Sequence, residues 1–147
     1  QRGNEPYLNL DAFHRIAATM GEALQFTFAC LGDEIVAVAV FFVGKDTLYG
    51  RYWGSAEEYH SLHFETCYHQ GIEFCIERGL QRFEPGTQGE HKVSRGFAPT
   101  FTWSAHRIVE PRFRAAIADY LAREKIGVEQ YAAGIAEHVP YKQELAP

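Results

Sequence analysis

An uninterrupted run of nine apolar residues, "IVAVAVFFV" at positions 35–43, strongly limits the secondary structure that this segment can adopt. It is far too short to cross a bilayer, and its composition is typical of a buried strand. Tight-turn sequences, "GDE" at 32–34 and "GKD" at 44–46, flank it. They predict hairpins to strands at residues 24–31 and 47–54. We therefore expect an antiparallel meander whose central strand is buried on both faces.

The clearest amphipathic stripe follows this meander and predicts a helix that ends at Gly79. Its apolar residues recur at three- and four-residue spacing: Phe64, Cys67, Tyr68, Gly71, Ile72, Cys75 and Ile76. Residues 80–85 predict a short strand directly after this helix. Because a crossover helix joins parallel neighbours, we expect that strand to lie parallel to residues 47–54.

Helices are also predicted at both ends of the chain. Asp11 is expected to cap the first, which Gly21 ends. Residues 100–109 predict a further strand, and Pro111 suits the first position of a long final helix. The order of elements predicts an α+β fold, in which a mixed, mostly antiparallel sheet has helices on both faces.

Length and charge narrow the class of protein. The 147 residues carry a formal net charge of −5, and 46% of them are hydrophobic. This length suits one domain, and the apolar content excludes a disordered chain. The acidic balance gives no global attraction to nucleic acid or to an anionic membrane. Three cysteines without a CxxC pair indicate reduced thiols, so we expect a cytoplasmic protein without membrane contact.

A first polar cluster lies between the third predicted strand and the striped helix: Glu57, Glu58, His60, His63 and Glu65. One interpretation is structural: Ser61 or His63 caps the helix, and Glu65 complements the helix dipole. The other is functional: His63 and Glu65 face the carboxyl ends of the flanking strands, where ligands commonly bind. The residues alone leave both interpretations open.

A second polar cluster occupies the loop "RFEPGTQGEHKVSRGF" at residues 82–97. His91 can move protons near neutral pH, whereas Lys92 and Arg95 can hold an anion. The alternative is an ordinary solvated basic turn. If residues 47–54 and 80–85 are parallel neighbours, both clusters follow strands that end at the same edge of the sheet. That convergence favours a reaction site.

Other kinds of site have weaker support. The spacing of His60, His63 and Glu65 matches no strong zinc motif, so we expect no metal. Cys67 and Cys75 lie on the apolar stripe, which is typical of inert core thiols. No GxSxG-like motif supports a serine triad.

Four motifs resemble a bacterial family of FemAB-like proteins within the GNAT acyltransferase superfamily, often described as peptidoglycan biosynthesis or recognition proteins. They are "GRYWG" at 50–54, "LHFE" at 62–65, "YHQGIEF" at 68–74 and "FEPGTQGEHKVSRGFAPT" at 83–100. The similarity is strong over residues 48–108 and weak in the flanks. Family members typically contain two tandem GNAT-like domains. The resemblance therefore implies that residues 1–147 are a single GNAT-like domain, the carboxy-terminal one of a longer protein.

The resemblance also implies N-acyl transfer, in which an amine attacks an activated acyl carbonyl. GNAT-like sheets splay between the strands before and after the central helix, and donor and acceptor meet in that gap. The expected base is Glu65 or His63, and His91 is expected to protonate the leaving group. The expected donor-binding residues are Arg51, Gln88, Lys92 and Arg95.

The donor has two alternatives. GNAT enzymes usually hold the CoA pyrophosphate in a Q/R-x-x-G-x-G/A loop before the central helix. Here the corresponding segment "GSAEEYHSLHFE", at residues 54–65, lacks that pattern and is acidic. Two donors therefore remain as alternatives: acyl-CoA, and aminoacyl-tRNA, which is the donor of FemAB-type relatives. The acceptor is expected to be a small-molecule or peptide amine.

Two further hypotheses belong to other classes. The chain is alternatively a degenerate GNAT-like domain that recognises a cell-wall peptide or a partner without catalysis. The final helix is also expected to form a homodimer or to dock a missing amino-terminal domain, because its apolar positions continue past Gly127.

Overall fold

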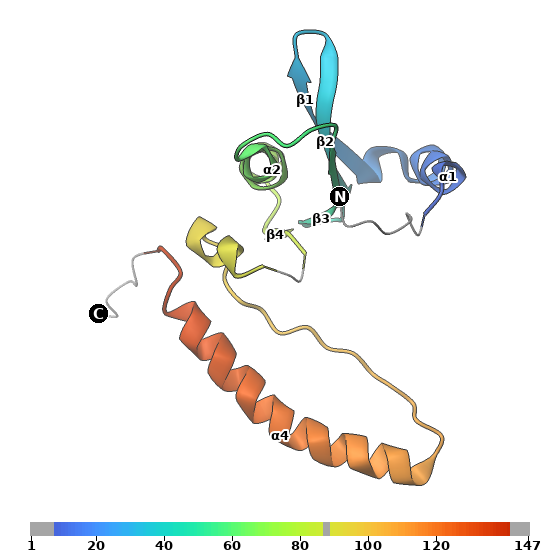
Figure 1. The fold of residues 1–147 in the computed structure, drawn as a ribbon, viewed down its shortest axis with the longest axis vertical. Coiled ribbons are helices and arrows are strands. Elements are labelled where there is room, and N and C mark those ends of the chain that lie inside the picture. Colours follow the sequence, from blue (N-terminus) through green and yellow to red (C-terminus); the bar gives the residue numbers. More distant parts are fainter. Residues whose placement is uncertain (1–7, 87–88, 142–147) are drawn as a thin grey trace. The chain divides into compact units, whose positions relative to one another are not determined.

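The computed structural model describes residues 8–86 and 89–141 (Figure 1). The chain forms two compact units, Gln1–Thr87 and Gln88–Pro147. The first contains the sheet and the helices packed on it, and the second contains a short 3₁₀ helix and one long α-helix. That the whole chain is one GNAT-like domain of a longer protein stays a prediction.

The sheet has four strands in the order β1-β2-β3-β4. β1 (Leu24–Leu31), β2 (Glu34–Val43) and β3 (Thr47–Ser55) form an antiparallel meander, and β4 (Arg82–Glu84) lies parallel to β3. Short hairpin turns and a helical crossover produce this order, so the predicted meander and parallel strand are confirmed. The α+β class is confirmed as well, and it is consistent with a GNAT-like fold.

The main core lies on one face of this sheet. Ala39, Phe41 and Leu48 pack there against Cys75 from the crossover helix. Within β2, burial alternates: Ala37, Ala39 and Phe41 are buried, whereas the intervening residues are only half-buried. The prediction that the central strand is buried on both faces is therefore wrong, because the second face is covered less completely.

That second face carries α1 (Leu10–Met20), so helices lie on both sides of the strands (Figure 1). The rings of Phe13 and Tyr52 meet edge to face with centroids 5.5 Å apart. An apolar cavity of about 540 Å³ remains between α1 and the sheet. The cap of α1 is Asn9, whose side-chain oxygen accepts from the Ala12 N–H at 2.9 Å, so the prediction of Asp11 as cap is wrong. Asp11 lies two residues after the cap and sits in the first turn.

The crossover is not one uniform α-helix. It runs as α2 (Leu62–Phe64), a π-helical turn η2 (Glu65–His69) and α3 (Gln70–Arg78). Gly79 ends it in a left-handed conformation with φ of 66°, as predicted. The predicted stripe is wrong at its outer edge, since Ile76 is 76% exposed. Cys75, which the predicted stripe also contains, belongs to the core as expected.

The second unit contains a 3₁₀ helix, η3 (Glu90–Arg95), and the long α4 (Pro111–Ala136). Proline begins α4 as predicted, and the Glu110 carboxylate accepts from the Phe113 N–H. The strand predicted at residues 100–109 is wrong, because the structure has irregular backbone there. A strand is defined by pairing with a neighbour, and an apolar, β-branched composition does not supply that neighbour.

Candidate functional site

β3 continues well beyond the strand that lies parallel to it. β4 pairs with β3 from Thr47–Arg82 to Tyr49–Glu84, whereas β3 extends to Ser55. In the part of the chain that the structure describes, residues 50–55 therefore pair with β2 alone. The parallel pairing thus ends before the carboxyl end of β3, the edge at which sheets with crossover helices commonly bind ligands.

β3 has a β-bulge at Arg51 in this region. Phe41 pairs with Gly50 and Val40 with Tyr52, so Arg51 is the extra residue between them. Bulges re-aim side chains and are frequent next to functional sites. Arg51 is exposed, and its guanidinium lies 5.0 Å from the centroid of the Tyr52 ring. Its role in donor binding stays a prediction.

Trp53 connects the same part of β3 to the crossover. Its indole N–H donates to Thr66 Oγ1 at 2.9 Å, and the Thr66 hydroxyl donates to the Leu62 carbonyl at 2.9 Å. Thr66 is only 2% exposed, whereas Trp53 is 39% exposed. A buried hydroxyl needs hydrogen-bond partners, and here the strand supplies one and the first helical turn the other.

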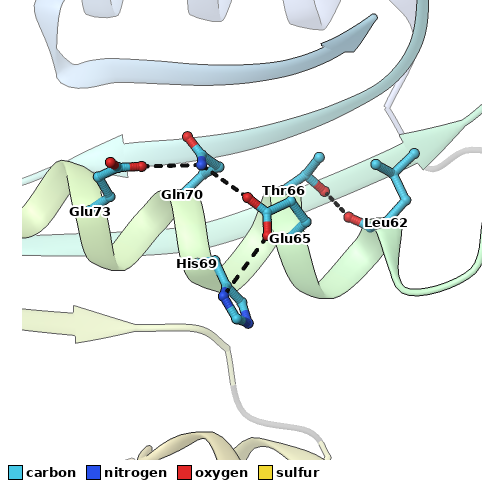
Figure 2. Close-up of polar contacts among 6 residues, drawn as sticks. All are labelled: Leu62, Glu65, Thr66, His69, Gln70 and Glu73. Carbon is cyan, nitrogen blue, oxygen red and sulfur yellow. Dashed lines mark hydrogen bonds and ion pairs between the residues drawn. The ribbon is translucent and has the colours of Figure 1, made fainter. Parts of the chain in front are cut away.

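Glu65 projects from the π-helical turn on the exposed side of the crossover (Figure 2). Gln70 Nε2 donates to Glu65 Oε1 at 3.0 Å, and His69 Nδ1 lies 3.9 Å from Glu65 Oε2. Gln70 Nε2 also donates to Glu73 Oε2 at 3.1 Å. The result is an accessible carboxylate, held by an amide and close to an imidazole, which suits proton transfer at a surface site.

His63 has a different environment from Glu65. Its half-buried ring meets Trp53, Phe64 and Tyr68 at steep angles, with centroids 5.1, 5.5 and 5.4 Å away. Such edge-to-face contacts are typical of packed aromatic clusters. Of the two predicted bases, Glu65 is therefore the more accessible.

Helix capping by the Ser61 or His63 side chain is a wrong prediction. Ser61 occupies the N-cap position of α2, but its side chain makes no capping hydrogen bond. Its backbone is left-handed with φ of 61°, and its hydroxyl lies 3.1 Å from His60 Nδ1. This conformation turns the hydroxyl toward the neighbouring imidazole instead of the helix.

The second predicted cluster lies in the other unit. His91, Lys92 and Arg95 all belong to η3. Arg95 Nη1 donates to the His91 carbonyl at 2.6 Å, and the Ser94 hydroxyl donates to the same carbonyl at 2.9 Å. Lys92 and Arg95 lie three residues apart on this 3₁₀ helix, and their role in holding an anion stays a prediction.

Gln88, the remaining predicted donor-binding residue, lies outside the described residues. The convergence of the second cluster with His63 and Glu65 stays a prediction.

A family model described as FemAB-like, peptidoglycan biosynthesis/recognition, matches residues 1–143. The chain belongs to the FemAB-like family. No curated protein and no solved structure gives a significant match. Membership confirms the resemblance seen in the motifs and relates this FemAB-like chain to peptidoglycan, while the GNAT link stays a prediction.

Three residues of the candidate site were not predicted from the sequence. His69 follows Glu65 at i+4 spacing, which is a usable signal for a side-chain pair on a helix. Trp53 and Thr66 are 13 positions apart and meet only through the fold, so no local pattern reveals their bond.

The structure also bears on the alternative sites. Cys75 is buried, so the prediction that it lies in the apolar core is confirmed, and burial raises the pKa of its thiol. Within residues 8–86 and 89–141, no group of three histidine, cysteine, aspartate or glutamate side chains has an arrangement suited to a metal ion. None of the helices in those same ranges has the length and apolarity needed to span a membrane.

Proposed function

We propose that this FemAB-like chain transfers an acyl or aminoacyl group to an amine, with Glu65 as the general base. The observation that carries the proposal is the exposed Glu65 carboxylate, held by Gln70 and lying 3.9 Å from His69, next to Thr66, which is bonded to Trp53 of β3. A base in this position can be reached by a substrate without opening the core.

In the proposed reaction the acceptor amine attacks the carbonyl carbon of the donor. A new C–N bond forms, and the proton released from the amine passes to the Glu65 carboxylate. The bond from the carbonyl carbon to sulfur in a thioester, or to oxygen in an aminoacyl ester, then breaks. The departing thiolate or alkoxide takes a proton, for which His91 is the proposed source.

Either donor is strongly anionic, so binding calls for cations. Lys92 and Arg95 lie on one 3₁₀ turn, and Arg51 is exposed at the bulge of β3. In this proposal these three residues bind the donor phosphates or stabilise the developing oxyanion. Acyl-CoA and aminoacyl-tRNA remain alternative donors, and a cell-wall peptide is the proposed amine acceptor, in keeping with the family description.

Recognition of a cell-wall peptide without catalysis is the second candidate function. Trp53 favours it: the indole is 39% exposed, while its N–H is already bonded to Thr66. A fixed, partly exposed aromatic ring is a common contact in peptide recognition.

Calorimetry with acyl-CoA, aminoacyl-tRNA and a muropeptide distinguishes the two functions. Transfer predicts binding of a donor and of the muropeptide. Recognition predicts binding of the muropeptide alone. Absence of binding to both donors would rule out the proposed transfer.

A further inference from the structure

The π-helical turn at residues 65–69 explains a contact that an ordinary helix does not allow. In an α-helix, residues five apart lie about 140° apart around the axis, because each residue turns by about 100°. Glu65 and Gln70 are five apart, yet their side chains are hydrogen-bonded at 3.0 Å. A π turn bonds each residue to the fifth one along, and the Gln70 N–H does donate to the Glu65 carbonyl. The wide turn therefore brings Gln70 to the Glu65 carboxylate.

π-Helical turns are rare and occur mostly as single turns inside α-helices, frequently at functional sites. Here Thr66, the residue after Glu65, is fixed from two sides. It accepts from the Trp53 indole N–H on β3 and donates to the Leu62 carbonyl one turn earlier. The Leu62 carbonyl also accepts the Glu65 N–H. The Thr66 hydroxyl and the Glu65 backbone N–H therefore share one acceptor at the start of the π turn.

From these contacts we infer that Trp53 and Thr66 are positioning residues, whose hydrogen bond holds the π turn that places Glu65 against Gln70. Thr66 faces the strand and is 2% exposed, while the adjacent Glu65 is exposed, so Thr66 can position Glu65 without touching a substrate. The inference deepens the proposed function, because the positioned group is the proposed base.

Two substitutions of Thr66 separate its hydroxyl from its methyl group. Thr66→Val keeps the shape of the side chain and removes both hydrogen bonds. Thr66→Ser keeps the hydroxyl and removes the methyl group. If the hydroxyl holds the π turn, only valine disrupts the contact between Glu65 and Gln70. If Thr66 merely fills space, serine is the more damaging change.

The readout is NMR of the full chain, which requires no substrate. In Thr66→Val we expect the Gln70 side-chain amide signals to move to their positions in Glu65→Ala, which lacks the acceptor oxygen. The Gln70 backbone amide should exchange roughly tenfold faster, as expected for one lost hydrogen bond. In Thr66→Ser both properties should stay at the wild-type values.

Trp53→Phe provides an independent arm if the valine variant does not fold. It removes only the indole donor and should shift the Gln70 signals in the same direction. Unchanged Gln70 signals in a folded Thr66→Val or Trp53→Phe variant would overturn the inference. Because no step depends on turnover, failure of Glu65 as a base would leave this result standing, and the reverse also holds.

Discussion

At the scale of single residues, the site depends on what surrounds each titratable side chain. His63 and Glu65 are two positions apart in the sequence, but one packs among three aromatic rings and the other is exposed. We therefore assign proton transfer to Glu65. The sequence supplied both candidates, but choosing between them needed the fold, because a spacing of two says nothing about which side chain is covered.

Asp46 gives a prediction on stability and pH. Its carboxylate accepts from the Thr47 hydroxyl at 2.7 Å and from Arg82 Nη2 at 3.0 Å, and these two bonds lower the pKa of Asp46 below 3.8. Near pH 3 the unfolded chain therefore binds the proton more readily than the folded chain. We expect the stabilisation to be complete above pH 3.8 and lost as the pH falls below it.

Urea unfolding of the wild type and of Asp46→Asn between pH 7 and pH 2 tests this expectation. The variant should be less stable at pH 7, and the difference between the two proteins should shrink toward pH 2. Arg82→Met removes a partner of the same carboxylate. It should also be less stable than the wild type at pH 7, and this difference should also shrink toward pH 2. A difference that stays constant with pH would contradict the assigned cause.

At the scale of elements, local signals predicted most of the first unit. The hairpins at 32–34 and 44–46 depend on nearby turn residues, so the meander is confirmed. The π turn and the irregular segment at 100–109 could not be predicted in this way. The first depends on the Trp53–Thr66 contact, and the second on the lack of a pairing partner.

Gly71 in α3 allows a test of the packing between helix and sheet. A Cβ atom at this position would lie 2.6 Å from Cζ of Phe83, whose ring is held in the core. We expect Gly71→Ala to destabilise the chain by about 1–3 kcal/mol through overpacking, despite the better helix propensity of alanine.

Gly134→Ala in α4 is the matched control, because a Cβ there meets nothing within 4 Å. It should stabilise α4 by roughly 0.5–1 kcal/mol. Thermal unfolding of both variants measures the two effects. A stabilising Gly71→Ala would show that the Phe83 ring moves aside freely.

At the scale of the whole molecule, burial within the second unit does not explain the apolar residues of α4. These apolar residues are three, four or seven positions apart, and none of them is buried: Ile117, Leu121, Val128, Tyr131 and Ile135. A homodimer through this helix stays a prediction from the sequence. Sedimentation velocity at increasing concentration should show self-association that Leu121→Glu abolishes, and a monomer throughout would contradict it.

The most direct test of the central claim is mass spectrometry of a muropeptide incubated with the full chain and either acyl-CoA or aminoacyl-tRNA. We predict a mass increase of one acyl or aminoacyl group on the muropeptide amine. Glu65→Gln should lower the rate about 10²–10⁴-fold, the usual contribution of a general base. Glu77→Gln, which changes another exposed carboxylate on the same crossover, should leave the rate unchanged. A muropeptide acylated equally fast by the Glu65→Gln variant would contradict the assignment of Glu65 as the base.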